Sequence, residues 1–191
     1  RSLLPYFSSD KSSIVQPEKN YVLLGQERHD VGRPNDFGYP VRGIVKDGFM
    51  YLKNYKSNRW PAGNPETGYT NTDGSPTKTE ILNLNRSRKN SQYLELNFGK
   101  HPEEELYQVS IDEYCLNNLA LNEEFISIKK ELKNILDSEL KKQNDPRIFG
   151  NGEVFDNYKP DRNVNFYENY MKGDKVKSGW INDSDFEKIQ K

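Results

Sequence analysis

The clearest periodic pattern of apolar side chains lies between residues 123 and 142. Its apolar residues recur at steps of three and four positions, which places them on one stripe of an α-helix. They are Phe125, Ile128, Leu132, Ile135, Leu136 and Leu140. Asn122 can cap the first turn, and Pro146 cannot continue the helix. The pattern therefore predicts a helix from about Glu123 to Lys142, and its apolar stripe needs a surface to cover it.

Short apolar runs predict the strands of such a surface. Tyr21–Gly25 is a candidate for a buried strand, and Glu105–Val109 is another strand candidate. Val41–Val45 and Phe49–Leu52 flank Asp47-Gly48, which is typical of a hairpin turn because Gly tolerates a positive φ. We predict an α+β fold: a small antiparallel sheet of about four strands, packed by one long C-terminal amphipathic helix, with long loops.

The rest of the chain predicts irregular structure. Residues 1–20 contain Ser and Pro clusters and are interpreted as a connecting segment, while residues 56–92 are rich in Gly, Pro, Asn, Thr and Ser and are interpreted as one long loop. After Pro146, polar residues alternate with aromatic residues, which predicts a peripheral wrap. We divide the chain into the connecting segment, an α+β subdomain at 21–145 and a peripheral extension at 146–191.

The composition suggests a domain that buries a face against a larger partner. Only 33% of the 191 residues are hydrophobic, and the mean hydropathy is -1.00. The net charge of -1 argues against a general surface for nucleic acid or another polyanion. No apolar stretch approaches the roughly 18–20 residues of a membrane span, so we expect no membrane partner.

A search of the sequence for catalytic residues mostly fails. His29 and His101 are the two histidines, which excludes a multi-histidine metal site. Cys115 has no nearby base or cationic helix start, so we interpret it as a half-buried apolar filler. The triplet at 103–105 is acidic and is interpreted as a solvated face rather than an acid/base pair. We therefore predict no catalytic residue, no metal ligand and no cofactor in this chain.

One polar loop concentrates side chains that could bind a ligand. It follows directly on the first predicted strand, a position from which loops place functional groups. Its substrate-binding candidates are Arg28, His29, Asp30, Arg33, Asn35 and Asp36. An arginine guanidinium suits bidentate recognition of sulfate or carboxylate, and a histidine can hydrogen-bond a sugar hydroxyl. The alternative is a surface loop held together by Arg–Asp pairs, and composition does not choose between the two.

A second candidate lies in the run Arg59–Glu66. Trp60 could stack on the face of a sugar, with Arg59 as a contact for an anion. The alternative, which we favour from the residue types, is that Trp60 anchors the long loop onto the core.

The segment Glu105–Ala120 resembles the C-terminal signature of type I sulfatases, whose usual form is E-L-Y-D-L-x-x-D-P-x-E-x-x-N-L-A. The matching residues are Glu105, Leu106, Tyr107, Asp112, Asn118, Leu119 and Ala120, and the departures are Gln108, Val109, Glu113 and Cys115. Other segments resemble the heparan N-sulfatase subgroup: Gly32–Asp36, Tyr39–Arg42, the Asp47-Gly48 hairpin, Arg59–Glu66 and Phe98–Glu105. The resemblance spans about residues 1–145.

This resemblance implies hydrolysis of sulfate esters or sulfamates on glycans. Type I sulfatases use a formylglycine made within a C/S-x-P-S-R motif and a Ca²⁺ ion held by Asp and Asn, and neither element occurs in this sequence. The resemblance places both in an N-terminal catalytic domain of the same chain, against which the present subdomain would pack. It also implies that the Arg28-His29 loop lies nearest the sulfated glycan, that this chain alone is inactive, and that the parent enzyme is periplasmic or secreted.

Two other hypotheses remain at this point. The chain could be a non-catalytic module for carbohydrate or anionic glycans, using Trp60 and neighbouring tyrosines, or a structural interaction domain. Saturable binding of heparin-like oligosaccharides by the chain alone would favour the binding module, and no binding would favour the sulfatase subdomain.

Overall fold

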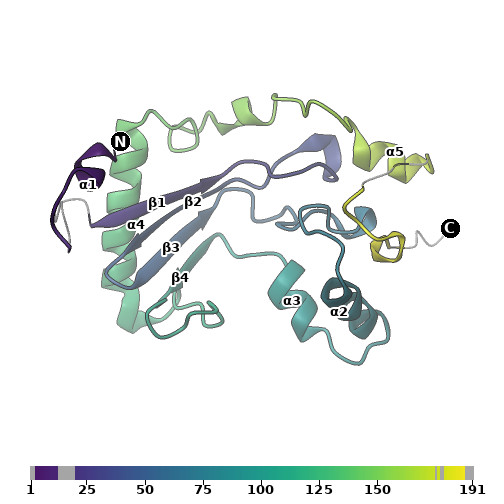
Figure 1. The fold of residues 1–191 in the computed structure, drawn as a ribbon, viewed down its shortest axis with the longest axis horizontal. Helices are drawn as coiled ribbons and strands as arrows, with labels where there is room; N and C mark the ends of the chain where they lie inside the picture. Colours follow the sequence, from purple (N-terminus) through teal and green to yellow (C-terminus); the bar gives the residue numbers. More distant parts are fainter. Residues whose placement is uncertain (1–2, 13–19, 175, 177–178, 188–191) are drawn as a thin grey trace.

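The computed structural model describes residues 3–12, 20–174, 176 and 179–187. Its centre is a four-stranded antiparallel sheet in the order β1-β2-β3-β4. The strands are β1 (Tyr21–Gln26), β2 (Val41–Lys46), β3 (Phe49–Asn54) and β4 (Glu104–Tyr107). The long helix α4 (Ile126–Lys142) crosses the sheet and covers one of its faces (Figure 1). The predicted α+β fold is confirmed.

Shorter elements surround this sheet. The helices are α1 (Leu4–Phe7), α2 (Pro76–Arg86), α3 (Gln92–Phe98) and α5 (Phe166–Lys172), and the 3-10 turns are η2 (Pro34–Asp36), η3 (Pro65–Thr67), η4 (Glu123–Phe125), η5 (Gly152–Phe155) and η6 (Asp183–Asp185). In Figure 1 the chain after α4 runs back along the sheet towards α5. Within the described residues, no helix combines the length and apolar character needed to span a bilayer.

The β2–β3 hairpin forms where the sequence predicts it. Asp47 and Gly48 have φ values of 49° and 78°, and positive φ at both turn positions matches the twist of two antiparallel strands. Lys46 and Phe49 are the last paired residues before the turn. The hairpin thereby fixes the register of the two central strands.

The main core lies between the sheet and α4. Leu132, Leu136 and Leu140 are no more than 4% exposed, and they pack in one cluster with sheet residues that are fully buried, namely Ile44, Tyr51 and Leu106. The Asn122 side chain accepts a hydrogen bond from the Glu124 N–H and caps η4, which leads directly into α4. The predicted apolar stripe of the helix and its packing against the sheet are both confirmed.

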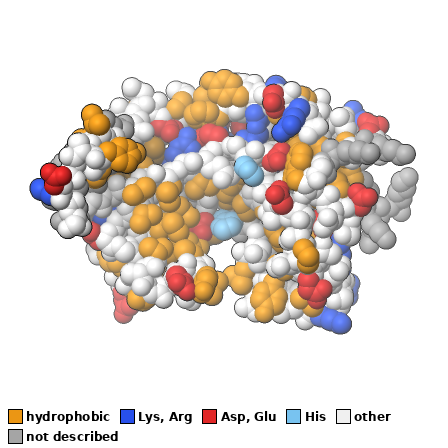
Figure 2. All heavy atoms as spheres, in the orientation of Figure 1, with side chains coloured by type: hydrophobic (Ala, Val, Ile, Leu, Met, Phe, Trp, Pro, Cys, Tyr) orange, Lys and Arg blue, Asp and Glu red, His pale blue; other side chains and the backbone are white. Residues whose placement is uncertain are grey.

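The first strand differs from the sequence-based expectation of a buried strand. β1 is an edge strand whose Tyr21 and Leu23 pack towards α4, whereas Val22 and Leu24 on the other face are 60% and 39% exposed. Figure 2 shows apolar side chains gathered over the strands. The prediction failed because a continuous apolar run does not tell whether both faces of a strand are covered by the same chain.

The predicted long loop at 56–92 contains α2 and the start of α3, so that prediction was wrong. Ser75 caps α2 by accepting a hydrogen bond from the Lys78 N–H, and Leu82 is buried in a second apolar cluster with Tyr69 and Phe98. Because only Lys78, Leu82 and Phe98 of these two helices are buried, the helices depend on a few tertiary contacts that local periodicity does not show. α1, which has no buried residue, was also missed in the connecting segment, and residues 1–2 and 13–19 of that segment lie outside the described residues.

The acidic triplet at 103–105 is not a solvated face as a whole. Glu104 accepts hydrogen bonds from the Tyr51 hydroxyl (2.7 Å) and the Lys133 amine (2.8 Å), while Glu105 is 2% exposed. Successive side chains of a strand point to opposite faces, so β4 directs Glu104 towards α4 and Glu105 to the other face. Only Glu103 fits the original interpretation.

Replacing Leu132 by alanine is expected to reduce the free energy of unfolding by about 2–5 kcal/mol, because this side chain is 3% exposed in the main core. Urea denaturation measures the loss. Leu121→Ala is the matched control, since Leu121 is 93% exposed, and its effect should stay within about 0.5 kcal/mol. Equal losses in the two variants would contradict the packing described here.

Candidate functional site

The two candidate loops of the sequence lie against each other. The Arg33 guanidinium donates hydrogen bonds from Nε to the Trp60 carbonyl and from Nη2 to the Pro61 carbonyl, both at 2.6 Å. The Thr67 hydroxyl donates to the Gly32 carbonyl at 2.7 Å. Segments that are about thirty positions apart along the chain are thus joined by three hydrogen bonds.

A pocket of about 420 Å³ opens at this junction. Its lining combines the cations Arg33, Lys56 and Arg59, the amides Asn35, Asn58 and Asn64, the rings of Phe37 and Trp60, and Pro34. No carboxylate is among these described lining residues. Cations can bind an anionic group, amides can hydrogen-bond hydroxyls, and an aromatic ring can pack on a sugar face. The lining is therefore suited to an anionic sugar.

The pocket brings together half of the predicted substrate-binding residues: Arg33, Asn35, Arg59 and Trp60. Sequence reasoning missed Lys56, Asn58 and Asn64. The sequence feature that could have indicated these three residues is their position, since all of them lie within four residues of Trp60 in the same polar loop. Trp60 also packs against the second apolar cluster, edge-on to Tyr69 with ring centroids 6.3 Å apart, so its anchoring role is present as well.

Arg33 is the unusual cation of this pocket. It is 1% exposed, and its Nη1 has no hydrogen-bond partner among the described residues. Burial, together with the neighbouring charge of Arg59, lowers the pKa of Arg33 to about 10, and the charge of Asp30 only partly offsets this. The guanidinium is still protonated at neutral pH. A buried cation without a counter-ion is costly, so an anion at this place would stabilise it.

The other two cations of the pocket are already paired. Arg59 holds the Asp156 carboxylate with both terminal nitrogens, at 3.0 and 2.9 Å, and lies 4.4 Å from the centre of the Phe37 ring. Burial alone would raise the pKa of Asp156, but the hydrogen bonds from Arg59 hold it below its usual value. The Lys56 amine lies 3.3 Å from the Glu153 carboxylate. Both acids belong to the extension after α4.

Arg28 and Asp36 do not line the pocket but join the loop to the extension. Arg28 donates to the carbonyls of Asp36 (3.0 Å) and Tyr158 (2.7 Å). The Asp36 carboxylate is buried and accepts hydrogen bonds from the Asn165 N–H at 3.0 and 2.9 Å. Within the described residues no Arg–Asp ion pair forms inside the loop, so the alternative of a self-paired surface loop is wrong in this respect. A substrate role for both residues stays a prediction.

Asp30 and His29 also lie outside the pocket lining. Asp30 accepts a hydrogen bond from the Val31 N–H at 2.7 Å and shapes the loop. His29 is exposed, and its imidazole makes no hydrogen bond to another described residue. Their predicted contact with substrate remains untested.

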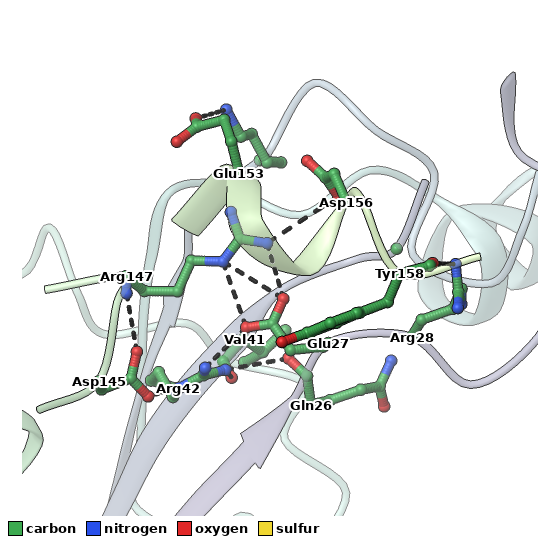
Figure 3. A network of polar contacts seen from close by, with 12 residues as sticks. Gln26, Glu27, Arg28, Val41, Arg42, Asp145, Arg147, Glu153, Asp156 and Tyr158 are labelled. Carbon is green, nitrogen blue, oxygen red and sulfur yellow. Dashed lines mark hydrogen bonds and ion pairs between the residues drawn. The ribbon is translucent and has the colours of Figure 1, made fainter. Parts of the chain in front are cut away.

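A largely buried charge network joins the first two strands to the extension after α4 (Figure 3). The Glu27 carboxylate accepts hydrogen bonds from Arg42 (2.6 Å) and Arg147 (2.7 Å), and Arg42 also donates to Asp145 at 2.6 Å. Burial would lower the pKa of Arg42, but these two carboxylates raise it above its usual value. Arg147 lies 4.0 Å from Asp156 and so connects the network to the pocket. A second pocket, of about 370 Å³, lies beside Arg42. Arg42 is already paired with Glu27 and Asp145, so this pocket is a weaker candidate for binding an anion.

The described residues do not fit the metal or nucleophile that the sulfatase resemblance implies. Among them, no group of three or more His, Cys, Asp or Glu side chains is placed to hold a metal ion. Burial and the nearby charge of Asp112 raise the pKa of the half-buried Cys115 thiol, which disfavours the reactive thiolate. No chemical step is therefore assigned to calcium or formylglycine in this chain.

Comparison with known proteins supports a sulfatase relationship. No family model matches the chain. An ulvan-active sulfatase from Formosa agariphila is 29% identical over 125 residues, which cover 63% of this chain and 19% of that protein. The chain is thus a sulfatase-related domain, and it spans about a fifth of the length of this relative. This relative is named for ulvan, so the heparan N-sulfatase subgroup stays a prediction.

A second polar cluster lies on the sheet face opposite α4. The His101 Nδ1 lies 3.0 and 3.1 Å from the two carboxylate oxygens of Glu105, which also accepts from the Tyr107 hydroxyl at 2.6 Å. The hydrogen bond to Glu105 raises the pKa of His101. Burial would raise the pKa of Glu105, but the hydrogen bonds from His101 and Tyr107 lower it.

This pair predicts a pH-dependent contribution to stability. The pKa of His101 is higher in the folded state than its ordinary value of 6.5. Its protonation therefore stabilises the folded state fully at pH values below 6.5, and this stabilisation is lost as the pH rises through the folded-state pKa. The pKa of Glu105 is lower in the folded state than its ordinary value of 4.5. Its ionised carboxylate therefore stabilises the folded state fully at pH values above 4.5, and this stabilisation is lost as the pH falls through the folded-state pKa. We expect the difference in unfolding free energy between wild type and His101→Gln to be largest between these two values and to narrow at high pH.

Urea denaturation at several pH values checks this expectation. The control is the same substitution in a Glu105→Gln background, where the ion pair is absent and the pH dependence should disappear. A difference between wild type and His101→Gln that stays constant across the range would rule out the charged pair.

Proposed function

We propose that this chain is the C-terminal substrate-pocket subdomain of a sulfatase that hydrolyses sulfate ester or sulfamate groups on heparan-type glycans. The pocket supports this proposal most directly, because three cations and three amides meet beside the Trp60 ring. The sulfatase relationship supports the reaction class. The relative is named for activity on ulvan, so the heparan-type preference rests on the resemblance in Gly32–Asp36 and Arg59–Glu66.

The proposal assigns the bond-breaking chemistry to an N-terminal catalytic domain of the same chain, which would supply formylglycine and Ca²⁺. The sheet face opposite α4 is the surface we propose for its docking. Val22, Val45 and Met50 follow one another across this face, and Leu24 and Leu52 form the next row. Exposed apolar surface that continues across several strands typically marks an interface. Following the family, we place the complete enzyme in the periplasm or outside the cell.

A glycan-binding module without catalysis is the second candidate. One observation favours it: both loops that line the pocket belong to the described chain, so the pocket needs no second domain to form. Micromolar, saturable binding of heparin-like oligosaccharides to this chain alone would favour the binding module over the sulfatase subdomain.

The 191-residue chain by itself is expected to release no sulfate from a sulfated disaccharide, because none of its described residues supplies an activated nucleophile or a metal site. Ion chromatography of the reaction mixture measures free sulfate. Sulfate release that scales with the concentration of purified chain would contradict the proposal that catalysis belongs to the N-terminal domain.

In a polypeptide that joins this chain to its catalytic domain, Arg33→Gln is expected to lower kcat/KM for a sulfated glycan by roughly 10- to 100-fold. This range corresponds to the loss of about 1.5–3 kcal/mol from one hydrogen bond to a charged group. Arg88→Gln is the control, since Arg88 is exposed and does not line the pocket. Equal kcat/KM values for both variants, with thermal unfolding unchanged, would remove Arg33 from substrate binding.

A further inference from the structure

The extension after α4 supplies counter-charges to the pocket. Asp156 pairs with both terminal nitrogens of Arg59, and the two side chains are only 9% and 15% exposed. Glu153 pairs with Lys56 in a more exposed position. Lys56 and Arg59 line the pocket and neither acid does, so each acid neutralises its cation without itself taking a place in the lining.

Arg33 has no such partner among the described residues. Its side chain donates to the carbonyls of Trp60 and Pro61, which are neutral, and Nη1 is left without an acceptor. Asp30 is the acid whose charge acts on Arg33, but the two do not form an ion pair. Of the three cations that line the pocket, two are compensated by the extension and one is not.

We propose that Asp156 and Glu153 are specificity-determining residues that set the charge of this pocket, so that it takes a sugar carrying one negative charge there, as a sulfate monoester or a carboxylate. This inference rests on the proposed function and assigns a role to the extension. A group with two negative charges would have to compete with Asp156 for Arg59. Removing an extension acid would therefore favour dianions over monoanions.

Two small anions of similar shape test the charge count: methyl sulfate carries one negative charge and inorganic sulfate carries two. Each is titrated into the full 191-residue chain, and the NMR signals of the Trp60 indole and the Asn58 side-chain amide report binding at the pocket. We expect wild type to bind methyl sulfate in the millimolar range. A parallel titration with acetate distinguishes a carboxylate from a sulfate ester, because the tighter ligand identifies the group.

Asp156→Asn keeps the shape of the side chain and removes one negative charge. A unit charge about 5 Å away in water changes the affinity of a monoanion by about fourfold and that of a dianion by about sixteenfold. The ratio of sulfate to methyl sulfate affinity should therefore rise by about fourfold. Glu153→Gln should shift the ratio in the same direction by a smaller factor, because this acid is exposed and screened by solvent.

Glu131→Gln is the matched control. Glu131 is an exposed glutamate in an ion pair with Lys46, 3.1 Å away near the β2–β3 turn, so the variant makes the same charge change away from the pocket. Its affinity ratio should equal that of wild type. If both extension variants behave like Glu131→Gln, the charge-setting role is wrong while the proposed function stands. If neither anion shifts the pocket signals of wild type, the charge-setting role is wrong, and the proposed function is then decided by the kcat/KM of Arg33→Gln in the complete enzyme.

Arg33→Gln provides an independent check, since it should abolish methyl sulfate binding. Because Arg33 also ties two loops together, circular dichroism must show that this variant is folded before its binding is interpreted. The two extension variants leave the hydrogen bonds of Arg33 in place and do not depend on that condition.

Discussion

The arrangement of this domain depends on the carboxylate of Glu27, which two buried guanidiniums share. Arg42 comes from the second strand and Arg147 from the extension, and their side chains are 8% and 3% exposed. Breaking such a buried arrangement by removing one partner typically costs about 3–5 kcal/mol, because a charge is left without compensation. Since Arg42 also holds Asp145 just after α4, one cluster fixes the sheet, the helix end and the extension together.

This constraint explains why the pocket has its particular charge. The network holds the start of the extension against the sheet, and the next residues of the extension then reach Lys56 and Arg59. The domain in this way lines the candidate pocket with three cations, two of which are balanced by acids of the extension. The balance matters because burial disfavours a charged guanidinium and neighbouring cations repel one another, and these two effects, burial first, lower the pKa of Arg33.

Sequence patterns predicted the elements whose signals are local. The helix over the main core and the hairpin at Asp47-Gly48 follow from periodicities of 3.6 and two residues and from one turn motif. The same reasoning missed α2 and α3, in which only Lys78, Leu82 and Phe98 are buried. In the site, it found Arg33 and Trp60 by residue type. It could not tell them from Arg28 and Asp36, whose hydrogen bonds hold the extension instead.

The sequence by itself determined the fold class, the pairing of β2 with β3 through their two-residue turn, and the supply of cations, amides and aromatic rings in two loops. The tertiary structure decided which of these side chains meet. Glu27 and Arg147 are 120 positions apart, and Arg59 and Asp156 are 97 positions apart. Contacts over such separations leave no periodic trace in the chain, because they depend on how whole elements pack rather than on the spacing of neighbouring residues.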